Sequence, residues 1–196
     1  MDITVRYFEK GGNYTDDVLA HVKPIVEARN IKDIIVASTR GETGIKACKI
    51  LDSKSRNVIV VTHSAGFAGV NRQELKDEQK AAIEAAGGKV LTTTHALSGV
   101  ETGFSKKLGG GNVIYPVELF ARLLRLIVAD GVKVAIEIAV MAADAGLIPD
   151  VKNDVLCIGG TGTGADTACI IRPAYSRDFT ELRLKQILCK PEIARE

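Results

Sequence analysis

The sequence predicts an α/β fold in which helices cover both faces of a mostly parallel sheet. Three short runs rich in branched apolar residues, Asp33–Ala37, Asn57–Thr62 and Lys89–Thr92, have the pattern of buried strands. Longer segments between them carry apolar residues at helical spacing. Continuous apolar strands that alternate with amphipathic helices favour a parallel sheet. With 196 residues the chain can form a substantial core, and we expect one domain over residues 1–196.

The first half of the chain is expected to supply three helices between these strands. Apolar residues recur at helical spacing over Val18–Val26, ahead of the first strand. A helix over Thr43–Asp52 separates the first two strands. A third helix, over Gln73–Ala86, ends at Gly87-Gly88, a common signal for a helix C-terminus.

The second half is less regular. His95–Asn112 is small, polar and glycine-rich, and we expect a short helix and a mobile loop there. The strand-like runs Asp154–Ile158 and Thr167–Ile171 are close enough to form an antiparallel hairpin. Leu182–Cys189 is expected to add an edge strand. Two amphipathic helices precede the hairpin, with apolar sides made by Phe120, Leu123, Leu124, Ile127 and Val128, and by Val134, Ile138, Met141, Ala142 and Ala145.

Composition argues against several classes of protein. The formal net charge is +2 and Lys/Arg are interleaved with Asp/Glu, so we expect no nucleic-acid partner. No apolar run reaches the roughly 18 residues of a membrane helix, and no signal peptide follows Met1. We therefore expect a cytoplasmic protein without a membrane partner. Scattered cysteines without a C-x-x-C motif indicate buried thiols rather than a metal site; they are Cys48, Cys157, Cys169 and Cys189.

The segment Ala37–Gly44, "ASTRGETG", lies between a strand and a helix and is the first candidate site. Free amides at a helix N-terminus, with hydroxyls and a cation beside them, can hold a phosphate. The donors would come from Ser38, Thr39, Arg40, Gly41, Thr43 and Gly44. It is not a Walker A loop, and Glu42 would repel a phosphate unless it points away. Ordinary capping of the helix by Ser or Thr explains the same composition equally well.

A second glycine-rich loop follows the strand near residue 158. Its residues are Gly160, Thr161, Gly162, Thr163 and Gly164. A dinucleotide fingerprint must open a helix, whereas a strand follows here. The loop is therefore either a glycine-rich hairpin turn or a rim of N–H donors over a ligand. Asp166 beyond it would accept a hydrogen bond from a hydroxylated ligand or cap the turn.

Two histidines end successive strands, in the pairs Thr62-His63 and Thr94-His95. Residues at this end of an α/β sheet often lie near the ligand crevice, and histidine titrates near neutral pH. A surface histidine without a function is the more frequent outcome. A G-x-S-x-G motif is absent, so a hydrolase triad is not supported and no catalytic residue is assigned.

Lys133, Glu137 and Asp144 recur along one helix. Lys133 is placed to pair with Glu137 four residues on. A charged stripe facing water is the favoured interpretation. If that side is covered instead, Glu137 becomes a candidate anchor for a cationic or hydroxyl group.

Four phrases carry a resemblance to a known family: "YFEK", "ASTRGETG", "VTHSAGF" and "GGTGTGADTA". The stretch Asp33–Thr62 resembles the C-terminal domain of pyruvate kinase, and nearly the whole chain is similar to stand-alone relatives of that domain. The resemblance implies a three-layer α/β/α fold with a five-stranded sheet in the order 3-2-1-4-5, the last strand antiparallel. Strands 1 and 4 would flank the topological switch point, where open α/β sheets bind ligands.

The same resemblance implies a phosphate-containing ligand and no pyruvate kinase activity, since the catalytic barrel has no counterpart here. In pyruvate kinase the corresponding loop holds a phosphate of a sugar bisphosphate effector. The resemblance to the stand-alone relatives implies FMN as the ligand, which also ends in a phosphate. The Ser38–Gly44 loop would seat the phosphate, with His63, Phe67, Thr94 and His95 near the flavin ring. Alternatives are a regulatory module that senses a phosphorylated metabolite, and an interaction domain with an empty crevice. The sequence leaves the oligomeric state open, although symmetric homo-oligomers are common for such proteins.

Overall fold

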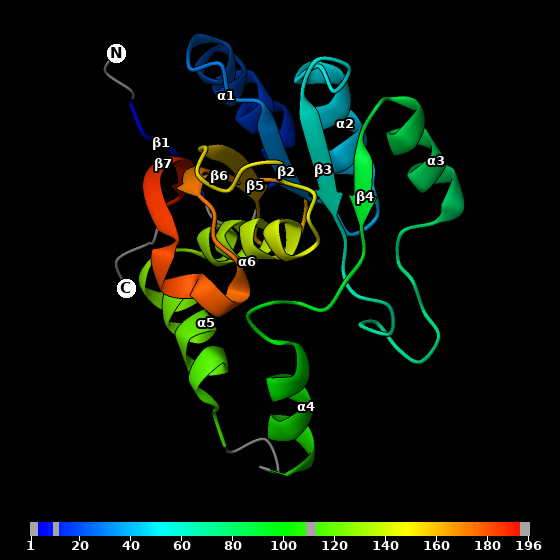
Figure 1. Ribbon diagram of the computed structural model, residues 1–196, viewed down its shortest axis with the longest axis vertical. Helices are drawn as coiled ribbons and strands as arrows, with labels where there is room; N and C mark the ends of the chain where they lie inside the picture. Colours follow the sequence, from blue (N-terminus) through cyan, green and yellow to red (C-terminus); the bar gives the residue numbers. More distant parts are fainter. Residues whose placement is uncertain (1–3, 10–11, 109–112, 193–196) are drawn as a thin grey trace.

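The computed structural model describes residues 4–9, 12–108 and 113–192, and its centre is a mixed β-sheet (Figure 1). Within these residues the sheet has seven strands in the order β1-β7-β6-β5-β2-β3-β4. β2, β3, β4 and β5 are mutually parallel, and β6 is antiparallel to both β5 and β7. The strand bounds are β1 Arg6–Phe8, β2 Asp33–Ala37, β3 Asn57–Val61, β4 Lys89–Leu91, β5 Val155–Gly159, β6 Thr167–Arg172 and β7 Arg183–Pro191.

Helices cover both faces of this sheet (Figure 1). On one face, α1 contacts β6, α2 contacts β2 and β3, and α3 contacts β4, and their apolar residues share one core. On the other face, α6 crosses β2, β5 and β6, and α5 packs on α6. The bounds are α1 Thr15–Ala28, α2 Glu42–Ile50, α3 Asp77–Ala85, α4 Gly99–Lys107, α5 Pro116–Ile127 and α6 Asp130–Asp144; a 3₁₀ segment, η1, covers Ser176–Glu181.

The α/β class and the hairpin of β5 and β6 are confirmed, whereas the expected number of strands is wrong. The sheet extends beyond β6 through β7 and then β1, so seven strands replace five in the described part of the chain. β7 is consequently an inner strand rather than the expected edge. β1 was missed because it has three residues and pairs with the opposite end of the sequence, Arg6 beside Cys189.

The interior is apolar and contains the four cysteines. All four are free thiols and buried, as predicted. Burial raises the pKa of the Cys189 thiol to about 12, so at neutral pH it is protonated and unreactive. α6 is buried on almost every side from Gly131 to Ala143, because the sheet covers one side and α5 another.

α4 and α5 extend from the body of the molecule (Figure 1), and many of their apolar side chains are exposed. The apolar side predicted for α5 is buried only in part. Leu123 and Ile127 are 43% and 70% exposed, whereas Leu124 and Val128 pack on the core. The polar side of α5 is turned toward a cavity described below. In the described ranges, no helix combines the length and apolar character needed to cross a bilayer. Residues 109–112 of the expected mobile loop lie outside the described residues.

Candidate functional site

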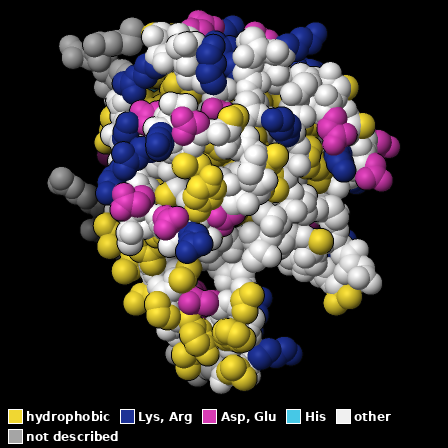
Figure 2. Space-filling model, in the orientation of Figure 1, with side chains coloured by type: hydrophobic (Ala, Val, Ile, Leu, Met, Phe, Trp, Pro, Cys, Tyr) yellow, Lys and Arg dark blue, Asp and Glu magenta, His cyan; other side chains and the backbone are white. Residues whose placement is uncertain are grey.

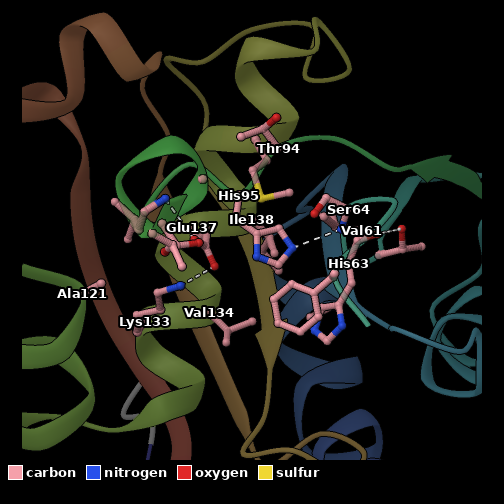
Figure 3. Close-up of a pocket in the computed structure, with 18 of the residues that line it drawn as sticks. Val61, His63, Ser64, Thr94, His95, Ala121, Lys133, Val134, Glu137 and Ile138 are labelled. Carbon is pink, nitrogen blue, oxygen red and sulfur yellow. Dashed lines mark hydrogen bonds and ion pairs between the residues drawn. The ribbon is translucent and has the colours of Figure 1, made fainter. Parts of the chain in front are cut away.

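A cavity of about 940 Å³ opens at the carboxyl ends of β2, β3 and β4 (Figure 3). The loops after these strands form one side of it, and residues of α4, α5 and α6 form the rest. Six of the candidate residues proposed from sequence line this cavity: Ser38, Thr39, His63, Phe67, Thr94 and His95. The sheet therefore brings the ends of three separate strands to one cavity.

Three aromatic rings gather inside it. The ring centroids of His63 and Phe67 are 4.0 Å apart, and that of His95 lies 5.5 Å from His63 and 5.2 Å from Phe67. Phe67 is 58% exposed although it is a large apolar side chain. An exposed phenyl ring beside two imidazoles gives the cavity a surface on which a flat ligand can stack.

Both histidines are held by hydrogen bonds. His63 Nδ1 lies 2.7 Å from Glu74 Oε2, and because a carboxylate only accepts, Nδ1 carries the proton. The Ser64 amide donates to His95 Nε2 at 3.3 Å, so that nitrogen carries none. Burial lowers the pKa of His95, and the nearby Lys133 and Arg125 side chains lower it further, against the opposing effect of the Glu137 carboxylate. His95 is therefore a neutral imidazole at pH 7.

Lys133 and Glu137 form an ion pair on α6 at the cavity wall (Figure 3). Their side chains are 4% and 7% exposed, which corrects the interpretation of a stripe facing water for these two residues. Asp144 alone remains exposed. The second carboxylate oxygen of Glu137 accepts a hydrogen bond from the Leu97 amide at 2.9 Å. Burial lowers the pKa of Lys133, while the Glu137 carboxylate partly restores it.

The charged lining is richer in cations than in carboxylates. Lys106, Arg122, Arg125 and Lys133 line the cavity, against two carboxylates, Glu118 and Glu137. Arg122 pairs with Glu118 at 2.7 Å, and Arg125 pairs with Asp130 at the start of α6. With Asp130 counted as the partner of Arg125, the cavity keeps one cation more than carboxylates, Lys106, and this remaining positive charge favours an anionic ligand.

Only the first half of the Ala37–Gly44 loop lines the cavity. Ser38 and Thr39 line it, whereas Arg40 is exposed and does not. The Ser38 hydroxyl accepts a hydrogen bond from the Gly44 amide at 3.1 Å and so satisfies one amide in the first turn of α2, whereas the N-cap position itself is Gly41, not Ser or Thr. The amides of Glu42 and Thr43 open α2 and have no acceptor within the helix. Glu42 is exposed and lies outside the cavity lining.

The glycines of this loop are explained by packing. Gly41 has φ of 95°, and a Cβ there would lie 2.8 Å from Gln79 Cβ. A Cβ at Gly44 would lie 2.6 Å from Val60 Cγ1, because α2 packs directly on β3. Together with Thr43, which is buried, they do not line the cavity.

The Gly160–Gly164 loop also stays outside the cavity lining and is tied to the start of α1. The Thr15 hydroxyl accepts from the Ala165 amide at 2.9 Å, and the Tyr14 amide donates to the Ala165 carbonyl. Asp166 caps the turn: one oxygen accepts from the Thr161 amide at 2.8 Å and the other from the Thr167 hydroxyl at 2.6 Å. Gly160, Thr161, Gly162, Thr163 and Gly164 thus form a hairpin turn, and their part in ligand binding stays a prediction.

Sequence reasoning missed several charged residues of the cavity. Glu118, Arg122 and Arg125 follow the spacing i, i+4, i+7, which places them on one side of α5 and was a usable signal. Glu74 lies eleven residues after His63 in an irregular segment, and no spacing rule connects them. No group of three or more metal-ligating side chains gathers within residues 4–9, 12–108 and 113–192.

No protein-family model matches this sequence. The resemblance to the stand-alone relatives of the pyruvate kinase C-terminal domain therefore stays a prediction.

Proposed function

We propose that this cavity binds a phosphate-containing ligand carrying a flat ring, with FMN as the favoured ligand. One observation carries the proposal: a single cavity of about 940 Å³ holds an exposed Phe67 ring, two imidazoles and more cations than carboxylates. Ligand cavities in proteins commonly have volumes of about 300–1,000 Å³.

The phosphate is assigned to the end of the cavity formed by Ser38 and Thr39. Thr39 is half-buried and offers a hydroxyl to this end of the cavity, beside Ser38. Glu42 does not stand in the cavity, so it does not oppose the assignment.

The ring of the ligand is assigned to the space beside Phe67, His63 and His95. Thr94 and Ser64 line the same space and can hydrogen-bond to the carbonyls and nitrogens of a flavin edge. The cavity lies at the carboxyl ends of β2, β3 and β4, not at the switch point between β2 and β5 that the resemblance implied, so the choice of FMN depends on the lining of the cavity.

A regulatory module that binds a sugar phosphate without catalysis is the second candidate. The excess of cations favours it equally, because it requires an anion and no ring. The exposed Phe67 ring, which a sugar phosphate would leave unused, makes FMN the better candidate.

Thermal unfolding with a ligand panel separates the two. A ligand that binds only the folded state raises the melting temperature. We expect FMN to raise it more than riboflavin, which lacks the phosphate, and more than fructose 1,6-bisphosphate or inorganic phosphate, which lack the ring. A rise with the sugar phosphate alone would favour the sensing module, and no rise with any of them would remove both candidates.

A further inference from the structure

α5 is an amphipathic helix whose polar and apolar sides are reversed relative to a normal surface helix. Glu118, Arg122 and Arg125 line the cavity. The opposite, solvent-facing side is apolar: Leu119 and Leu123 are 46% and 43% exposed, and Leu126 and Ile127 are 75% and 70% exposed. A soluble helix normally presents its polar side to water.

α4 continues the same apolar surface. Val100, Phe104 and Leu108 follow at intervals of four residues and are 66%, 46% and 76% exposed. Figure 2 shows hydrophobic side chains gathered over the part of the molecule where Figure 1 places α4 and α5. We call this the α4–α5 surface, made by Val100, Phe104, Leu108, Val113, Ile114, Val117, Leu119, Phe120, Leu123, Leu126 and Ile127.

The extent of the α4–α5 surface is that of a protein–protein interface. The exposed fractions of its residues add up to about six fully exposed apolar residues, or on the order of 1,000 Å² at aromatic and large aliphatic areas. A standard interface buries about 800 Å² of each partner. Apolar patches on monomers are usually about 300–600 Å².

We propose that the α4–α5 surface is the interface between two copies of this chain. Leu119, Leu123, Leu126 and Ile127 have the spacing i, i+4, i+7, i+8, which is the spacing of helices that pack on another helix. In a two-fold dimer each copy presents the same surface, so an apolar stripe on α5 is covered by its own counterpart. No other chain is then needed to explain it.

The charges argue for a second copy over a lipid surface. Membrane-bound helices place Lys and Arg along the solvent side and favour Trp at the interface. The chain has no Trp, and Arg122 and Arg125 line the cavity and pair with Glu118 and Asp130. Since α5 supplies both the apolar stripe and the cavity wall, the dimer interface would lie directly behind the ligand site.

Light scattering after gel filtration tests the proposal on the full chain. We expect a mass near twice the 20.9 kDa of one chain for the wild type at micromolar concentration. The double variant Leu126→Glu/Ile127→Glu should raise the dimer dissociation constant by about 100-fold or more, as loss of central interface residues does. Val70→Glu is the matched control, because Val70 is 90% exposed in the β3–α3 loop, outside the α4–α5 surface. Circular dichroism establishes that each variant is folded.

Disulfide trapping tests it without destabilising the fold. All four native thiols are buried, so one introduced cysteine is the reactive one. We expect at least one of Leu119→Cys, Leu123→Cys and Leu126→Cys to give a cross-linked dimer under mild oxidation, and Val70→Cys to give none.

Two results would overturn the proposal. One is a wild-type protein that is monomeric and gives no cross-linked dimer. If that monomer also floats with anionic vesicles, the α4–α5 surface is assigned to a membrane instead. The other is a dimer that survives Leu126→Glu/Ile127→Glu unchanged, because the interface would then lie elsewhere.

Discussion

The Lys133 ammonium lies 2.5 Å from the Glu137 carboxylate, and both side chains are more than nine-tenths buried. Removing one partner leaves the other as an uncompensated buried charge. Lys133→Met should therefore lower the free energy of unfolding by about 3–5 kcal/mol, measured by urea denaturation at pH 7.

The exposed pair of Lys46 and Asp16 is the matched control. Their side chains are 48% and 73% exposed, and Lys46→Met should cost about 0–1 kcal/mol. The double variant Lys133→Met/Glu137→Leu should recover much of the loss, because neither charge then remains buried. Equal losses for Lys133→Met and Lys46→Met would contradict the burial of the Lys133 pair.

Gly44 is predicted to serve packing rather than ligand binding. A Cβ there would lie 2.6 and 2.9 Å from the two γ-methyl groups of Val60, so Gly44→Ala should lower stability by about 1–3 kcal/mol. Gly103 in α4 has no atom within 4 Å of the corresponding position, and Gly103→Ala should raise stability by about 0.5–1 kcal/mol. Opposite signs in thermal unfolding are the expected result, and a neutral Gly44→Ala would refute the packing role.

His95 should make the folded state sensitive to acid. Its pKa is lowered by burial, so below about pH 6.5 the unfolded chain binds a proton more readily than the folded chain. Stability is therefore lost as pH falls from 6.5 through the lowered folded pKa, and His95 has no effect above that window. Urea denaturation between pH 5 and pH 8 should show a shallower acid loss for His95→Gln than for the wild type. Parallel curves would argue that His95 is solvated in both states.

Thr39→Asp should abolish the stabilisation by FMN while leaving the fold intact. A carboxylate at this position of the cavity repels the phosphate, and loss of a charge-assisted contact together with new repulsion should weaken binding by at least about 10-fold. Thr180→Asp, at an exposed position in η1, is the matched control. Unchanged FMN stabilisation in Thr39→Asp would place the phosphate elsewhere.

Thr163→Asp tests the second glycine-rich loop separately. Thr163 is exposed in the hairpin turn after β5 and does not line the cavity. We expect FMN binding to change by less than about 3-fold, because the new charge would lie in solvent outside the cavity lining, where salt screens it. A loss equal to that of Thr39→Asp would show that this loop takes part in binding.

The inner strands were predictable because their signal is local. Asp33–Ala37 and Asn57–Val61 are continuous apolar runs bounded by polar residues, and they form β2 and β3 within one residue of the prediction. The strand β1 was not predictable, since Arg6 pairs with Cys189 from the far end of the chain.

The sequence indicated which side of each helix is charged and which is apolar, but not which other elements cover those sides. The spacing of Lys133 and Glu137 predicted their pairing, but their burial depends on Leu97 and α5, which approach from other segments. In the same way, an apolar stripe through Leu123 and Ile127 is visible in the sequence, whereas its exposure is set by the packing of α5 on α6. Both features required the tertiary structure.

Titration of FMN, followed by quenching of its fluorescence on mixing with the protein, tests the central claim most directly. The account predicts saturable one-to-one binding per chain that is weakened by Phe67→Ala, which removes the exposed ring, and by Thr39→Asp, which adds a charge at the phosphate. It predicts weaker binding of riboflavin. A flavin fluorescence that stays constant up to excess protein would contradict the assignment of this cavity to FMN.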